Sequence, residues 1–326
     1  MVRKKLKKFP LKALAWIAGV FLILGVTALS PGPRDWLSDR FDTLALRWHE
    51  HEVESLLRDK GFTQREVLGL KAWASSTCAG ISAESCSCVA WIHGLGDQSM
   101  TWRKVLMADW RGHVAVPTQL WAWDLPGSGA TPPLTELEAK EGGYRVRQLA
   151  RRLKQSLMAV PGCQNWTLVG NSMGGWVAAW VALDWPQGVR QLALVNSAGF
   201  QRERKKGKRK QQRVFSGGAN LEQVVAELKK FQKNAYYKPR PLTDRQWMLA
   251  AQRMIDMPIS DLERAQVPEE DLDGKLAQLQ QRTLIIWGEA DRVIAPENAQ
   301  RFAQEIKKSE LKMLPGCGHL PQKECP

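Results

Sequence analysis

The sequence predicts an α/β fold, with a mostly parallel sheet, helices on both faces and a helical segment inserted between two strands. Three observations favour this class: short apolar runs alternate with segments that fit helices, a glycine-rich turn follows one run, and the alternation stops in one long stretch. Alternating strands and helices are typical of parallel sheets, because the connecting helices bury both faces. A chain of 326 residues can bury a large core and also hold an insertion.

The regular elements follow from the apolar runs and the segments between them. Short apolar runs predict strands at residues 89–92, 119–123, 166–169, 191–195, 283–287 and 311–314. The intervening segments fit helices at residues 144–158, 174–183 and 297–307. No internal repeat is visible in the sequence, so we expect one core.

The alternation stops between residues 197 and 281, where three sequences typical of helix starts appear. They lie at residues 220–223, 243–246 and 260–263, and each has the pattern of a capping box. The first is followed by apolar residues at the spacing of one helix face: Leu221, Val224, Val225 and Leu228. We therefore expect residues 200–281 to form a helical lid.

The net charge of +14 is concentrated in two short segments. Six of the first twelve residues are Lys or Arg, and residues 202–213 hold eight Lys or Arg and one Glu. The rest of the chain is nearly neutral, which excludes a diffusely basic nucleic-acid-binding domain.

The second basic segment, residues 202–213, has three interpretations. It can be a solvated loop, or it can contact anionic lipid headgroups, where each basic residue adds about 1 kcal/mol of binding. Binding to nucleic acid is the weakest interpretation, because no aromatic stacking platform lies beside the segment. We therefore expect no nucleic-acid partner.

An apolar stretch at residues 13–29 follows the first basic segment. As a helix it would span about 25 Å, near the short end of what crosses a bilayer. It predicts an uncleaved membrane anchor, with a cytoplasmic N-terminus and the folded domain on the far side, the periplasm in a bacterium. A cleaved signal peptide has the same layout and would leave a secreted or periplasmic protein.

These features divide the chain into four predicted parts. They are a membrane anchor or signal peptide at residues 1–30, a first part of the core at 31–199, the lid at 200–281 and a second part of the core at 282–326.

Six cysteines lack the spacing of a metal site: Cys78, Cys86, Cys88, Cys163, Cys317 and Cys325. Disulfides in an exported domain and free cysteines both remain open, and the sequence does not show which residues would pair. A bridge between Cys317 and Cys325 would fix the loop that contains His319.

Ser172 lies in the sequence Gly-Asn-Ser-Met-Gly-Gly, directly after the apolar run at residues 166–169. A G-x-S-x-G pattern between a strand and a helix is typical of a nucleophile elbow, a sharp turn that exposes the serine. The turn strains the serine backbone, so its neighbours must be small, as Gly170 and Gly174 are. A glycine-rich turn with an incidental serine has the same pattern, so the interpretation depends on finding partners.

A serine hydroxyl becomes nucleophilic when a histidine takes its proton and a carboxylate holds that histidine. In a fold of this class the chain order is serine, acid, histidine. Asp291, just past the run at 283–287, is the predicted acid, and Glu289 is the alternative. His319 alone among the histidines follows Asp291, and it also comes after a strand. No such setting surrounds His49, His51 or His113.

A tetrahedral intermediate needs two backbone N–H donors for its oxyanion. We expect one from Met173, directly after the serine, and one from Leu95, in the glycine-containing loop after the strand at 89–92. We interpret His93 as a structural residue of that loop. These residues imply no metal and no organic cofactor.

In this order the motifs resemble the α/β-hydrolase superfamily. The resemblance covers residues 85–326 and rests on His93-Gly94, Asp124-Leu125-Pro126-Gly127-Ser128-Gly129, the Ser172 turn, Gly288-Glu289-Ala290-Asp291 and Gly318-His319. It implies an α/β-hydrolase fold with Ser172, Asp291 and His319 as its catalytic triad.

Finer details, at residues 170–175, 194–200 and 237–239, resemble the lipase and monoacylglycerol-lipase-like branch, whose members often carry an N-terminal membrane anchor. In some superfamily members the acid follows the preceding strand. Asn196 occupies that place here and cannot serve, which favours Asp291. The superfamily continues into a final helix, whereas this sequence ends at Pro326, so the resemblance leaves a C-terminal truncation open.

The resemblance implies a serine hydrolase at a membrane that cleaves carboxylic esters, of acyl glycerols or other lipids, through an acyl-enzyme. A short-chain carboxylesterase, a thioesterase and a carbon–carbon-bond hydrolase are alternatives with the same fold. An alternative of another class is a catalytically inactive hydrolase-fold protein that binds a partner at the membrane.

Overall fold

The computed structural model describes residues 52–80, 82, 85–108, 116–140, 143–200, 220–258 and 268–326. The chain divides into two compact units, Met1–Glu52 and Val53–Pro326, and the second unit is described below. The expected membrane segment, the basic segment at 202–213, the helix start at 260–263, His49, His51 and His113 lie outside the described residues. Within the described residues, no helix has both the length and the apolar character needed to cross a bilayer.

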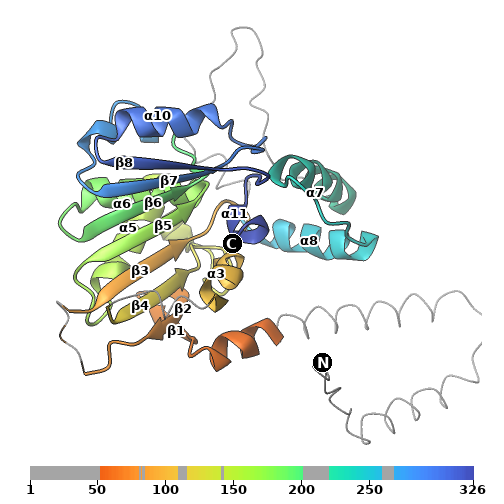
Figure 1. Ribbon diagram of the computed structural model, residues 1–326. Coiled ribbons are helices and arrows are strands. Elements are labelled where there is room, and N and C mark those ends of the chain that lie inside the picture. The colour runs from red at the N-terminus through yellow and green to blue at the C-terminus, as the bar shows by residue number, and fades with distance from the viewer. Residues whose placement is uncertain are drawn as a thin grey trace, which may run out of the picture. The chain divides into compact units, whose positions relative to one another are not determined.

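Eight strands form one sheet in the order β1-β2-β4-β3-β5-β6-β7-β8 (Figure 1). Their bounds are β1 Thr63–Val67, β2 Leu70–Ser76, β3 Ser87–Ile92, β4 Thr118–Trp123, β5 Trp166–Asn171, β6 Val189–Val195, β7 Arg282–Gly288 and β8 Ser309–Leu314. β2 pairs antiparallel with β1 and with β4, and all the other neighbouring pairs are parallel. This mostly parallel sheet confirms the predicted fold class, and β3 to β8 contain the six predicted strands.

The hairpin of β1 and β2 is absent from the sequence-based prediction. Its turn consists of Leu68 and Gly69, with φ of 49° and 81°. Two successive positive φ values are typical of the tight turns that join antiparallel strands, and Asn-Gly is the usual signal for them. Here Leu68 occupies the position of the Asn, so the usual sequence signal is missing. The strand β1 is also mostly exposed and polar, so it lacks the apolar pattern of a core strand.

Helices cover one face of the sheet along most of its width. They are α5 (Val146–Met158), α6 (Met173–Asp184) and α10 (Glu297–Glu305), close to the three predicted helices. Leu149 of α5, Val177 of α6 and Phe302 of α10 share one hydrophobic cluster with strand residues such as Ala90.

A second hydrophobic cluster lies on the opposite face. Alternate residues of a strand point to opposite faces, and Ala122 of β4 packs here with Trp102 and Leu106. These two side chains belong to η2 (Ser99–Trp102) and α3 (Arg103–Met107). Helical segments therefore cover both faces, as predicted. Other short helices are α4 Glu136–Lys140, η3 Pro268–Glu270, η4 Leu276–Gln278 and α11 Pro321–Glu324.

Two helices, α7 (Leu221–Ala235) and α8 (Asp244–Asp256), follow β6 and precede β7 in the predicted lid, and they lie side by side (Figure 1). Thr243 forms the expected reciprocal capping box with Gln246 at the start of α8. At the start of α7 the expectation was only partly right. The Asn220 side chain accepts one bond, from the Glu222 backbone, because its short amide reaches the second residue of the helix.

Three disulfides join the six cysteines: Cys78–Cys86, Cys88–Cys163 and Cys317–Cys325. The second bridge joins β3 to the loop before β5, across a sequence separation of 75 residues. The other two each close a separation of 8 residues. The alternative of free cysteines is therefore not found in the structure.

We expect the variant Cys88→Ala/Cys163→Ala to lose roughly 2 kcal/mol more free energy of unfolding than Cys78→Ala/Cys86→Ala. A bridge restricts the unfolded chain, and its effect grows with the length of the loop that it closes. The two pairs are matched, because all four cysteines are buried. Urea unfolding of both variants and the parent protein measures the difference, and equal losses would contradict this account.

Candidate active site

Ser172 lies at the sharp turn between β5 and α6, with φ of 54° and ψ of −122°. This region of backbone conformation is sparsely populated and costs on the order of 1–3 kcal/mol. Two glycines allow the turn to form. A Cβ atom on Gly170 would overlap the carbonyl oxygen of Gly174, and a Cβ atom on Gly174 would overlap the carbonyl oxygen of Ile92. The strand, the helix and β3 therefore approach too closely for any other residue.

Asp291 and His319 form a buried pair after the ends of β7 and β8. The Nδ1 atom of His319 lies 2.7 Å from Oδ2 of Asp291. The other carboxylate oxygen, Oδ1, accepts bonds from the backbone N–H groups of Val293 at 2.8 Å and Ile294 at 2.9 Å. These bonds orient the carboxylate and leave Nε2 of His319 for another partner. Glu289, the alternative acid, is exposed, and its side chain makes no bond to His319 among the described residues.

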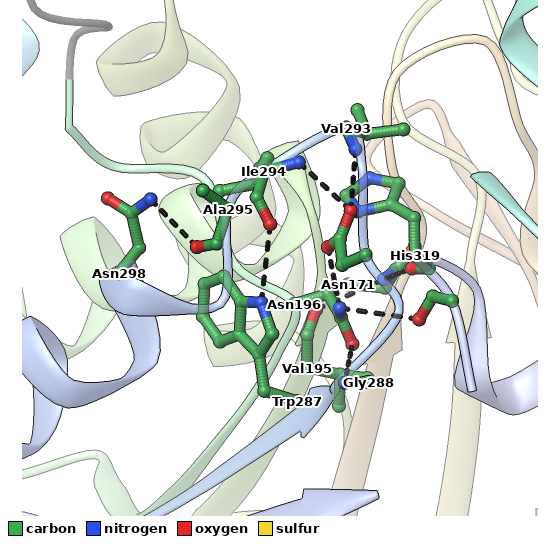
Figure 2. A network of polar contacts seen from close by, with 12 residues as sticks. Asn171, Val195, Asn196, Trp287, Gly288, Val293, Ile294, Ala295, Asn298 and His319 are labelled. Atoms are coloured by element: carbon green, nitrogen blue, oxygen red, sulfur yellow. Dashed lines mark hydrogen bonds and ion pairs between the residues drawn. The ribbon is translucent and has the colours of Figure 1, made fainter. Parts of the chain in front are cut away.

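Asn196 is a member of this network whose role was not foreseen. Its Nδ2 atom donates to Oδ2 of Asp291 at 2.6 Å, and its Oδ1 atom accepts from the Gly288 backbone at 3.3 Å (Figure 2). The sequence showed only that an amide stands after β6, where some superfamily members carry the acid. An amide at this place can donate to a carboxylate, so Asn196 holds the Asp291 side chain, which lies just after the next strand, β7.

The loop of His319 is fixed at its backbone as well. The His319 N–H donates to the carbonyl of Ala235, the last residue of α7, at 2.7 Å. The His319 carbonyl accepts from Nδ2 of Asn171 at 3.2 Å. Since Asn171 directly precedes Ser172, this bond brings the histidine loop to the end of β5.

Gln322 of α11 is a second contributor that the sequence analysis missed. Its buried side chain donates from Nε2 to Oδ1 of Asn171 at 3.1 Å and to Oγ1 of Thr101 at 3.3 Å. The disulfide Cys317–Cys325 closes the segment that carries both His319 and Gln322. No local pattern identifies such a residue, because its role depends on partners far away in the sequence.

Ser172 and His319 are brought to the same end of the sheet, but no bond joins the serine hydroxyl to the histidine within the described part of the chain. Such bonds are often long in structures without substrate and tighten when substrate binds. Ser172 is half-buried, and the bond from Asn171 to the His319 carbonyl holds the two residues at the same end of the sheet.

The two expected oxyanion donors flank Ser172. Met173 is the first residue of α6, where backbone N–H groups have no partner within the helix. Leu95 lies in the loop after β3, and Gly94 of that loop packs against Ser172. Among the described residues, the N–H groups of Leu95 and Met173 donate no hydrogen bond, so both are available to a ligand.

His93 and Asp97 hold the loop that contains Leu95. The buried His93 ring accepts from the Leu125 backbone with Nε2 at 3.0 Å, and its Nδ1 faces the Gly94 carbonyl at 2.8 Å. Asp97 pairs with Lys323 of α11 at 2.6 Å. Burial alone would raise the pKa of Asp97, but the charge and hydrogen bond of Lys323, together with His93 and Thr101, outweigh burial and lower that pKa. This ion pair joins the loop after β3 to the segment after His319.

The part of the chain that the structure describes contains no group of three or more His, Cys, Asp or Glu side chains arranged for a metal ion. The side chains that meet at the carboxyl ends of the strands are instead a serine, a histidine, a carboxylate and amides. This is the set of groups that acyl transfer through a covalent intermediate requires.

Known proteins resemble this chain over most of its length. A family model described as alpha/beta hydrolase fold matches residues 89–326. Lipase 3 of Moraxella sp. (strain TA144) is 27% identical over 238 residues, which cover 72% of this chain and 71% of that protein. Lipase 1 of Psychrobacter immobilis is 28% identical over 251 residues, with the same coverage. A 2-hydroxy-6-oxononadienedioate/2-hydroxy-6-oxononatrienedioate hydrolase of Klebsiella pneumoniae is 26% identical over 224 residues, covering 62% and 70%.

Solved structures show the same fold. A membrane phospholipase A superposes with a TM-score of 0.66 and 21% identity, over 96% of this chain and 94% of its own. A putative lipase from Acinetobacter baumannii superposes with a TM-score of 0.65 and 20% identity, over 85% and 91%. The family match, the eight-stranded sheet and the turn at Ser172 agree, and the chain belongs to the alpha/beta hydrolase fold family.

Proposed function

We propose that the protein is a serine hydrolase that cleaves carboxylic esters, with acyl glycerols or other lipid esters as its substrates. The observation that carries this proposal is the buried pair of His319 and Asp291 at the sheet end where Ser172 occupies its strained turn. A base held by a carboxylate beside a serine on such a turn is the arrangement of a nucleophilic triad.

In the proposed reaction, Nε2 of His319 takes the proton of Ser172 while Oγ attacks the ester carbonyl. Asp291 keeps Nδ1 protonated and stabilises the imidazolium that forms. The N–H groups of Leu95 and Met173 donate to the oxyanion. His319 then protonates the leaving alcohol, and a water molecule, deprotonated by the same histidine, releases the acid from the acyl-enzyme.

The surface of the lid supports a lipid substrate. Large apolar side chains are exposed on α8 and in the segment that precedes it: Tyr237, Leu242, Met248 and Ile255. Exposed apolar groups that gather in one region are typical of surfaces that meet lipid or a partner. The relatives that are named lipases agree with an ester of this kind.

A carbon–carbon-bond hydrolase is the second candidate, since a relative named as a hydrolase of an oxononadienedioate matches at 26% identity. The same fold also accommodates a thioesterase, a short-chain carboxylesterase and an inactive protein that binds at a membrane. Labelling of the serine and comparison of substrates separate these functions from that of a lipid esterase.

For location, we propose that residues 13–29 anchor the protein with the hydrolase domain beyond the membrane, and that the basic segment at 202–213 adds a contact with anionic lipid. The apolar run and its basic flank support this proposal. N-terminal sequencing of the mature protein tests it, and we expect the residues before Leu29 to be present. Their loss would identify a cleaved signal peptide instead.

We expect a fluorophosphonate probe to label the parent protein and not the variant Ser172→Ala, because the probe traps an activated serine. Ester hydrolysis should fall by a factor on the order of 10⁶ in that variant. The exposed Ser82 provides a matched control, and Ser82→Ala should label like the parent. A folded parent protein that does not label would contradict the enzyme proposal.

The same assay distinguishes the two candidate acids. Asp291→Asn should lower kcat by about 10⁴-fold, since the amide no longer holds the reactive tautomer of His319. Glu289→Gln, at an exposed residue of the same loop, should keep the parent rate. A large loss of kcat in Glu289→Gln with the parent rate in Asp291→Asn would identify Glu289 as the acid.

Activity on p-nitrophenyl esters of increasing acyl length tests the substrate class. A lipid esterase should reach its highest kcat/KM with medium or long chains, because added methylene groups are buried on binding. Thioester analogues of equal acyl length serve as the comparison for a thioesterase. A sharp optimum at the shortest acyl groups would instead identify a short-chain carboxylesterase.

A further inference from the structure

A cationic pocket lies between α3, α11 and the segment that joins α7 to α8. It has a volume of about 110 Å³ and is lined by Thr101, Arg103, Lys104, Tyr236, Arg240 and Lys323. We propose that this pocket binds the phosphate group of a glycerophospholipid substrate while an ester of the same molecule meets Ser172. The proposal rests on the ester hydrolase function above and names its substrate class.

The walls of the pocket connect directly to the candidate active site. Thr101 accepts the bond from Gln322, which also donates to Asn171, the residue before Ser172. Tyr236 follows Ala235, whose carbonyl accepts from the His319 backbone. In a glycerophospholipid, a short glycerol unit separates the phosphate from the esters. Gln322 links the pocket wall at Thr101 to Asn171, the neighbour of Ser172, so the proposal places the phosphate in the pocket and the reacting ester at Ser172.

The charge of the pocket is strongly positive. Of its four cationic side chains, only Lys323 has a carboxylate partner within the described residues, namely Asp97. Arg103 donates to the Met100 carbonyl, and Lys104 donates to the Lys323 carbonyl, so neither charge is neutralised.

Two carboxylates lie beside these four cations and reduce the positive charge without cancelling it. Asp97 pairs with Lys323, and Glu324 accepts from the backbone N–H groups of Tyr237, Lys238 and Gly318. Burial raises the pKa of Tyr236, so its hydroxyl remains protonated and can donate at neutral pH. Two arginines, two lysines, a tyrosine and a threonine thus line a small open space.

A phosphate group suits this donor set better than other anions in an ester substrate. Guanidinium groups form paired hydrogen bonds to phosphate oxygens, and ammonium groups add point charges. The carboxylate of a released fatty acid would lie at Ser172, where its ester carbon reacted, and not in a side pocket. A neutral acylglycerol would leave the cations without a partner.

The test compares phosphatidylglycerol and diacylglycerol with identical acyl chains in mixed micelles. We expect the parent to favour phosphatidylglycerol, and Arg103→Gln/Arg240→Gln to lower the ratio of the two kcat/KM values on the order of tenfold or more, because charged hydrogen bonds to phosphate are lost. The control Arg65→Gln/Arg190→Gln removes two charges at exposed strand residues, in β1 and β6, and should keep the parent ratio. Equal ratios in all three proteins would overturn the proposal.

Inorganic phosphate, added at constant ionic strength, distinguishes lipid-borne phosphate from free phosphate. We expect it to inhibit hydrolysis of phosphatidylglycerol competitively and weakly. If it inhibits both lipids equally and the parent shows no preference, the pocket binds a free anion and the proposal fails.

Binding separates this proposal from the function on which it rests. Calorimetry with dihexanoyl phosphatidylglycerol and Ser172→Ala should show binding that is lost in Ser172→Ala/Arg103→Gln/Arg240→Gln. Such binding without hydrolysis of any ester would contradict the hydrolase function and leave the phosphate site standing. Ester hydrolysis with a lipid preference that does not depend on Arg103 and Arg240 would contradict the phosphate site and leave the hydrolase function standing.

Discussion

The buried carboxylate of Asp291 organises the end of the sheet where the candidate active site lies. A charge removed from water is tolerated only where hydrogen bonds satisfy it. Four donors do so here: the backbones of Val293 and Ile294, the Asn196 amide and the His319 ring. Because these donors come from the ends of three neighbouring strands, one charge fixes three segments relative to each other, and Asn171 and Gln322 extend the network to β5 and α11.

Most of the parallel sheet could be predicted, because each of its strands is an apolar run that stands out locally. The antiparallel β1 could not, since its polar, exposed residues and its Leu68-Gly69 turn carry little signal. The serine turn and its partners follow from motif order. Asn196, Asn171 and Gln322 do not, because an amide side chain acquires its role from partners that the fold brings from elsewhere. The cysteine pairs depend on folded distances in the same way.

The predicted lid contributes contacts to the candidate site. Its first helix ends at Ala235, whose carbonyl holds the His319 backbone, and the next residue, Tyr236, lines the cationic pocket. The loop of His319, the proposed phosphate site and the predicted lid therefore meet at one short stretch of backbone. A displacement of α7 would change the position of His319 and the shape of the pocket together.

The bridge between Cys317 and Cys325 encloses His319, Gln322 and Lys323 in one covalent ring. Without the bridge, hydrogen bonds and one ion pair alone would hold His319, the Gln322 amide that reaches β5 and the Lys323 cation that pairs with Asp97. Disulfides persist in oxidising compartments and are reduced in the cytosol. The redox state of its surroundings thus acts on the alignment of the proposed catalytic base, and maturation of the site is coupled to the place where the chain is oxidised.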